Sequence, residues 1–118
     1  MAKKESMAEF QEERARLNDV VMKYAGLTTK RFFSLDGQAY RESDGLPVKY
    51  KELMGLVASL VLRCDDCIKY HINRSFEEGV TDQELDEAMS IGLIVGGSIV
   101  IPHLRRAWDA WNDLKSQG

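Results

Sequence analysis

The sequence is poor in cysteine, in net charge and in long hydrophobic runs, and each scarcity excludes a class of protein. Two cysteines in 118 residues cannot build a disulfide-rich secreted scaffold. A net charge of −3 without a basic face gives nucleic-acid binding little electrostatic support. The opening MAKKES is too short and polar for a secretory signal. We therefore expect a cytoplasmic protein that does not bind nucleic acid.

The longest apolar run, at residues 91–102, does not predict a membrane span. A spanning helix needs roughly 20 apolar residues. This run ends earlier, at Pro102, and two arginines follow at positions 105 and 106. We expect no contact with a membrane, and we interpret the run as a buried helix.

Helical periodicity accounts for most of the chain, while the alternation typical of strands is scarce. Ser6 with Glu9 and Thr81 with Glu84 match the capping box that begins a helix. A chain of this length and 44% hydrophobic content fits one compact core. The sequence therefore predicts a single all-α domain, a helical bundle.

The predicted helices follow from these signals and from the glycines and prolines between them. The first ends at Gly26, and the second begins at Thr28 or Thr29 and precedes a loop at residues 42–47. The third shows helical spacing of apolar residues at positions 50, 53, 54, 57, 60 and 61. A fourth carries the cysteines and ends at Gly79, a fifth ends near Gly96, and a last one contains two tryptophans.

The stretch RCDDCIKYH carries the chemistry. At about 100° per residue, Cys64, Cys67 and His71 fall within a roughly 60° arc of one helix. The Cα atoms of a helical C-x-x-C pair lie about 5–6 Å apart, within reach of a disulfide. Asp65 and Asp66 oppose a thiolate, whereas a helix N-terminus and a charged His71 stabilise one.

Several interpretations of these residues stay open on spacing alone. Two free cysteines are often plain buried residues. Cys64, Cys67, His71 and the distant His103 are also enough ligands for a zinc ion. A permanent disulfide would close only a trivial loop and constrain little of the unfolded chain. A structural or adaptor protein would contain thiols that are inert to mild oxidants.

The longer stretch KELMGLVASLVLRCDDCIKYH resembles the carboxymuconolactone decarboxylase family, in particular its alkyl hydroperoxidase D-like branch. Glu52, Cys64, Cys67 and His71 meet that branch's pattern Glu-x11-Cys-x-x-Cys-x3-His in full. The resemblance extends over roughly residues 30–114. We expect the family's domain at residues 28–118, after an N-terminal helical extension at residues 1–27.

The resemblance implies a thiol-dependent peroxide reductase or disulfide oxidoreductase that needs no metal and no cofactor. By analogy, Cys67 attacks a small organic hydroperoxide, Cys64 resolves the product, and His71 backed by Glu52 relays the proton. An external dithiol, carried by a lipoyl or thioredoxin-like protein, would reduce the resulting disulfide. The family fold also implies a homo-oligomer, a trimer or a hexamer. The apolar residues before Cys64 suggest a dry pocket for an organic peroxide.

One position departs from the pattern. Some hydroperoxidases of this branch have a second histidine just before the second cysteine, where this chain has Asp66. Asp66 is therefore a candidate modulator, through a shorter relay, a less acidic thiol or a different substrate. The namesake lactone decarboxylation needs no redox thiols and is the alternative activity.

Overall fold

The structure is a computed structural model that describes residues 4–117. All regular secondary structure in these residues is helical. Its elements are α1 (Met7–Tyr24), α2 (Leu27–Tyr40), α3 (Val48–Leu62), α4 (Asp65–Glu77), α5 (Asp82–Gly96), the short 3₁₀ helix η1 (Ser98–Val100) and α6 (Ile101–Gln117). This arrangement confirms the predicted all-α domain.

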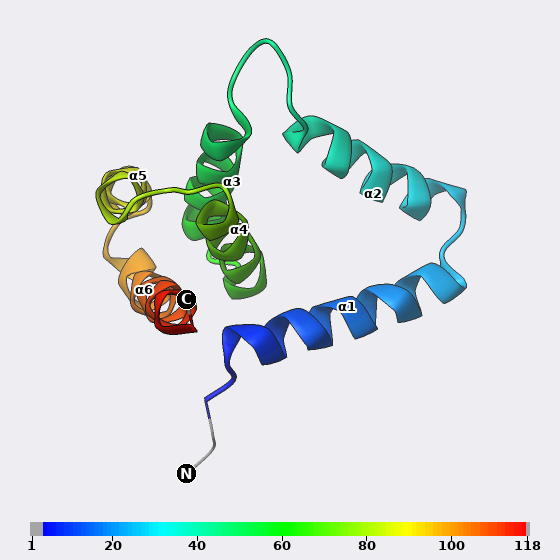
Figure 1. Cartoon of the computed structure of the whole chain (residues 1–118), viewed down its shortest axis with the longest axis horizontal. Coiled ribbons are helices and arrows are strands. Elements are labelled where there is room, and N and C mark those ends of the chain that lie inside the picture. Colours follow the sequence, from blue (N-terminus) through cyan, green and yellow to red (C-terminus); the bar gives the residue numbers. More distant parts are fainter. Residues whose placement is uncertain (1–3, 118) are drawn as a thin grey trace.

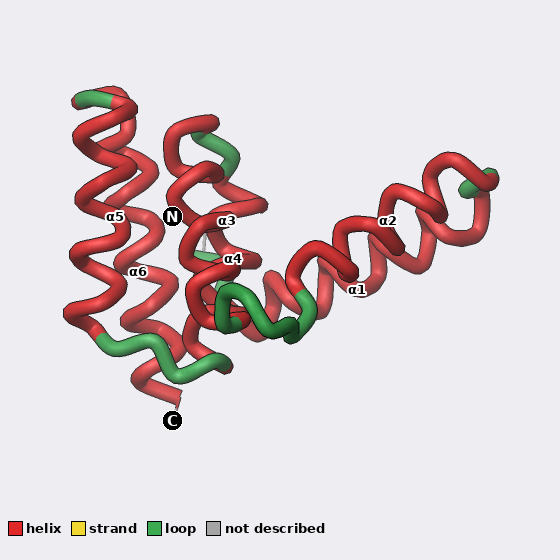
Figure 2. The backbone as a smooth tube through the Cα atoms, turned by 90° about the horizontal axis from the view of Figure 1, so that it is seen from above, coloured by secondary structure: helices red, strands yellow, loops and turns green. Residues whose placement is uncertain are grey.

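The helices divide into a packed body and a projecting arm. In the body, α3 packs against both α4 and α5, and α4 packs against α6. Figure 2 shows α1 and α2 extending away from these four helices. The beginning of α1 anchors the arm, because Met7 and Phe10 are buried in the core. None of the residues of α2 is buried.

The core lies between the body helices and is mostly aliphatic, with Phe10 and Trp111 as its buried aromatic residues. Leu56 and Leu60 of α3 and Ile72 of α4 are fully buried. The stripe of α6 containing Trp111 and Leu114 belongs to this core, with Leu104 and Trp108 packed against it. Core packing therefore accounts for Trp111, while Trp108 is only partly buried.

The connection between α3 and α4 positions the site. Only Arg63 and Cys64 separate the two helices, and Arg63 adopts the left-handed conformation with φ 58°. The chain folds back at this turn, so that α4 lies against α3, as Figure 1 shows. Residues before the turn on α3 are thereby brought against residues after it on α4.

Most of the predicted boundaries agree with the structure. Both capping boxes are present, and Gly97, with φ 81°, ends α5. The start of the second helix was predicted wrongly. Gly26 precedes α2 as its N-cap and does not end α1, which ends at Tyr24. No threonine side chain caps α2.

One prediction of burial is wrong. Residues 91–102 form no single buried helix, because Gly97 divides them between α5 and η1, and Ile94 is 82% exposed. On α3, the buried face contains Leu53, Leu56 and Leu60, while Tyr50 and Met54 point outward. Within residues 4–117, every helix is too short or too polar to cross a membrane.

Candidate functional site

The two cysteines form a disulfide at the beginning of α4. Cys64 is the N-cap of the helix and Cys67 lies in its first turn, with Cα atoms 5.3 Å apart. The backbone N–H of Cys67 also donates to the Cys64 sulfur at 3.3 Å. Cys67 is exposed and Cys64 is half-buried. Both sulfur atoms therefore lie at the positive end of a helix, where the dipole stabilises a thiolate.

Glu52 of α3 and His71 of α4 form a buried pair. His71 Nδ1 lies 2.8 Å from Glu52 Oε1, and the residues are 8% and 1% exposed. A buried carboxylate requires hydrogen-bonding or charged partners. Arg74, one turn after His71, is the second partner, with its Nε 3.6 Å from Glu52 Oε2. The bond to Glu52 fixes Nδ1 as the proton donor and leaves Nε2 of neutral His71 as an acceptor.

The acceptor edge of His71 meets a tyrosine from the arm. The Tyr40 hydroxyl lies 3.5 Å from Nε2, and the two ring centroids are 5.3 Å apart. In the described part of the chain, no hydrogen bond joins His71 to either sulfur atom. Proton transfer between Cys67 and His71 would therefore need an intervening group or a movement of one of the two side chains.

The two aspartates beside the cysteines differ in their surroundings. Asp65 Oδ1 accepts from His103 Nδ1 at 2.8 Å, and Asp65 Oδ2 accepts from Arg106 Nε at 3.1 Å. Burial acts to raise the pKa of Asp65, but the hydrogen bonds from His103 and Arg106 outweigh it and hold that pKa below its usual range. Asp66 is exposed. The Asp65 charge is thus offset by hydrogen-bond donors of α6.

The proposed zinc ligands do not come together. His71 binds Glu52 and His103 binds Asp65, so the two imidazoles engage different carboxylates. Within residues 4–117, no three side chains among histidine, cysteine, aspartate and glutamate are grouped to hold a metal ion.

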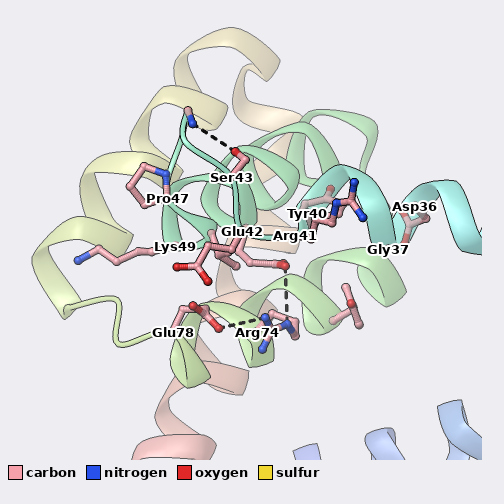
Figure 3. A pocket seen from close by; sticks show the side chains of 14 residues that line it. Asp36, Gly37, Tyr40, Arg41, Glu42, Ser43, Pro47, Lys49, Arg74 and Glu78 are labelled. Atoms are coloured by element: carbon pink, nitrogen blue, oxygen red, sulfur yellow. Dashed lines mark hydrogen bonds and ion pairs between the residues drawn. The ribbon is translucent and has the colours of Figure 1, made fainter.

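A cavity of about 670 Å³ lies beside Glu52, between the α2–α3 loop and α4. Its lining is largely charged and includes Arg41, Lys49, Arg74 and Glu78. Figure 3 shows Arg74 joined to Glu78 at the cavity wall. Neither cysteine lines it. The apolar residues before Cys64 instead line a separate groove, in which Met54 and Val57 of α3 lie beside Ile91 of α5. The use of an apolar pocket by an organic peroxide stays a prediction.

Three residues at this site were missed in the sequence. Arg74 had a readable signal, since it follows His71 by three residues and so shares its face of α4. Gly55 also had one, because a glycine inside a helix of apolar residues needs a reason. Tyr40 had none, because only the tertiary fold brings the end of α2 to His71.

Fold and site together define a class: a small all-helical domain whose C-x-x-C pair precedes a histidine that binds a buried glutamate. The sequence profile of the carboxymuconolactone decarboxylase family matches residues 26–110. The chain belongs to this family.

Solved structures support the same assignment. A protein from Thermotoga maritima, TM1620, is 56% identical, and a crystal structure of it superimposes with a TM-score of 0.89 over 92% of this chain and 95% of its own. A second crystal structure of TM1620 superimposes with a TM-score of 0.87, over 92% of this chain and 91% of its own. An antioxidative response has been suggested as the process in which TM1620 takes part.

More distant relatives share less. The apo form of lpg0406, a family protein from Legionella pneumophila, has a TM-score of 0.82 at 20% identity, over 91% of this chain and 95% of its own. That likeness concerns the fold alone. An uncharacterized protein of Cupriavidus necator is 28% identical over 60 residues, which are 51% of this chain. The chain spans about half of that relative's length, 53%.

Proposed function

We propose that this protein is a thiol-dependent hydroperoxide reductase of the alkyl hydroperoxidase D-like branch, which cycles between a dithiol and a disulfide. One observation carries the proposal: an accessible Cys64–Cys67 disulfide precedes His71, whose Nδ1 is bonded to the buried carboxylate of Glu52. The suggested antioxidative part of TM1620 agrees with it.

The first step is attack by Cys67 on the terminal oxygen of a small organic hydroperoxide. The Cys67 thiolate forms an S–O bond as the O–O bond breaks, and the released alkoxide takes a proton and leaves as the alcohol. Sulfur is oxidised to the sulfenic acid and the peroxide is reduced. Cys67 suits this role because its side chain is exposed, whereas that of Cys64 is half-buried.

The second step closes the cycle. The Cys64 thiol attacks the Cys67 sulfenic acid, a disulfide forms, and water leaves. An external dithiol on a lipoyl or thioredoxin-like protein then reduces the disulfide by exchange and is itself oxidised. A Cα separation of 5.3 Å allows the bridge to form with little movement of the backbone.

Proton transfer is assigned to His71 and Glu52. His71 takes the proton from the Cys67 thiol on Nε2, while its Nδ1–H stays bonded to Glu52. The Glu52 carboxylate stabilises the imidazolium that results. Arg74 forms an ion pair with the other oxygen of that carboxylate, with its Nε 3.6 Å from Oε2. Asp66 is a modulator at most, because its exposed charge is screened by solvent.

Exchange of each cysteine for serine tests the assignment. With cumene hydroperoxide and dithiothreitol, turnover should disappear in both Cys67→Ser and Cys64→Ser. In a single exposure without reductant, Cys64→Ser should still form one sulfenic acid per chain, detected by dimedone labelling and mass spectrometry. Cys67→Ser should form none. Undiminished peroxide consumption by Cys67→Ser would reject the mechanism.

We also propose that the protein is a homo-oligomer, in keeping with the family's trimers and hexamers. A helix of 14 residues with few tertiary contacts is marginal in water, and α2 has no buried residue. Its outward side carries Leu27, Phe32 and Leu35, all more than 60% exposed. A second copy offers an apolar groove to receive it, between the outer faces of α3 and α5, with Met54, Val57 and Ile91 in its lining.

A further inference from the structure

The end of the arm enters the site through a single side chain. Tyr40, the last residue of α2, is half-buried although the rest of that helix is exposed. Its hydroxyl oxygen lies 3.5 Å from His71 Nε2, and its ring is tilted by 36° against the imidazole. The catalytic scheme above makes no use of Tyr40, although it contacts the atom that must accept the thiol proton.

Gly55 of α3 makes this approach possible. A Cβ atom at this position would lie 2.5 Å from the Tyr40 hydroxyl oxygen and 2.6 Å from His71 Cε1. Contacts that short do not occur, so any larger residue would displace the tyrosine or the imidazole. Glycine weakens the interior of a helix. Its backbone at Gly55 has no positive φ to explain its presence. We conclude that the glycine at position 55 permits the close approach of the Tyr40 and His71 rings.

Gly92 of α5 provides a contrast. A Cβ atom there would lie 3.5 Å from Leu60 and 3.6 Å from Val57, which are ordinary packing distances. Of these two glycines, only Gly55 would place the added methyl group against polar atoms of the site.

The groups around the Tyr40 hydroxyl keep it protonated. Burial raises the pKa of Tyr40, and the negative charges of Glu52 and Asp36 raise it further. The phenol is therefore a donor at neutral pH. Because His71 Nδ1 donates to Glu52, its Nε2 accepts. The resulting order is hydroxyl, imidazole and carboxylate, from helices α2, α4 and α3.

We propose that Tyr40 is a positioning residue, which holds the Nε2 edge of His71 in line as Glu52 holds the Nδ1 edge. This inference rests on the proposed thiol chemistry. A separation of 3.5 Å is at the long limit for a hydrogen bond. The Tyr40 hydroxyl thus restrains the His71 ring. It releases the lone pair of Nε2 when the reduced Cys67 transfers its proton to that atom. Because Tyr40 ends α2, the position of the arm decides whether the imidazole is aligned.

Tyr40→Phe tests the role, with Tyr24→Phe as a matched control at an exposed position of the same arm. In the oxidised protein, the ¹⁵N resonance of His71 Nε2 should move in Tyr40→Phe toward the value of an unbonded acceptor. In the reduced protein, sulfenic acid formation at Cys67 with cumene hydroperoxide should slow roughly fivefold, the loss expected for one hydrogen bond. Tyr24→Phe should change neither quantity.

Gly55→Ala and Gly92→Ala form a second matched pair. Gly55→Ala should move the Nε2 resonance and slow the same reaction by more than Tyr40→Phe does, while Gly92→Ala leaves both unchanged. Circular dichroism verifies that each variant is folded.

The outcomes separate this inference from the proposed function. An unmoved resonance in Tyr40→Phe, or an unchanged rate despite a moved resonance, would overturn the positioning role. A wild-type protein that does not react with peroxide, together with a resonance that moves, would refute the peroxidase and support the Tyr40–His71 bond.

Discussion

Asp65 illustrates how a carboxylate lies beside two sulfur atoms without opposing a thiolate. Its two oxygens are bonded to His103 and Arg106 of α6, so its charge is directed away from the cysteines. The sequence shows the acid next to the thiol, but its two hydrogen-bond partners follow about 40 residues later. Asp65 is an unfavourable neighbour of the cysteines in the sequence, but in the structure it links α4 to α6.

Asp65→Asn should reduce stability at neutral pH but not in acid. The folded-state pKa of Asp65 lies below its usual range, so its contribution is fully present above the unfolded value of about 4 and is lost as the pH falls through the folded value. Because Asp65 is partly exposed, we expect a loss of about 0.5 kcal/mol at pH 7. Thermal unfolding of the wild type and of Asp65→Asn, at pH 7 and at about pH 2, measures the difference in stability at each pH.

Asp66→Asn is the control for this prediction, because Asp66 is the exposed neighbour and makes no ion pair within residues 4–117. It should leave the unfolding temperature nearly unchanged at both values of pH. An Asp65→Asn deficit of equal size in acid would contradict the linkage.

At the scale of elements, the helices were predictable because capping residues and periodicity act over three to eight residues. Ser6 and Thr81 cap α1 and α5 as their sequence context indicates. The face of α3 that would be buried was not predictable. Apolar residues surround most of that helix, and only its packing against α4 and α5 selects Leu53, Leu56 and Leu60 for the core.

The turn between α3 and α4 also gives a prediction. Arg63 has a left-handed backbone, φ 58°, which a Cβ atom disfavours by roughly 1–2 kcal/mol. Glycine relieves this strain but loses more backbone entropy on folding. Arg63→Gly should therefore raise the free energy of unfolding by up to about 1 kcal/mol in urea denaturation.

Arg63→Ala is the matched control, since it removes the same exposed side chain and keeps the Cβ atom. It should leave the free energy of unfolding close to that of the wild type, at one fixed protein concentration. Equal stability of the glycine and alanine variants would show that the turn is not strained.

At the scale of the whole molecule, the packing of one chain does not account for the exposed apolar surface of the arm. The arm exposes nine large hydrophobic side chains on α1 and α2. The outer faces of α3 and α5 expose several further ones, such as Met54 and Ile91. Soluble monomers rarely expose apolar surface of this extent. Assembly would cover these surfaces and would also fix the helix that ends in Tyr40.

Sedimentation should therefore detect a species several times the chain mass of 13.4 kDa. Phe32→Asp should dissociate it, because loss of a buried phenylalanine costs about 3 kcal/mol, or roughly 100-fold in the association constant. Lys30→Asp, an exposed position on the same helix that tests for the effect of a new acid, should dissociate it far less. A wild-type monomer at micromolar concentration would refute the assembly.

The sequence by itself determined the helices, the helix caps and the spacing of Glu52, Cys64, Cys67 and His71, because each depends on residues that are near one another in the chain. Only the tertiary structure decided that Arg74, Tyr40 and Gly55 surround the imidazole, and that His103 pairs with Asp65. Contacts between helices depend on how the chain turns between them, and a short sequence pattern does not encode that direction.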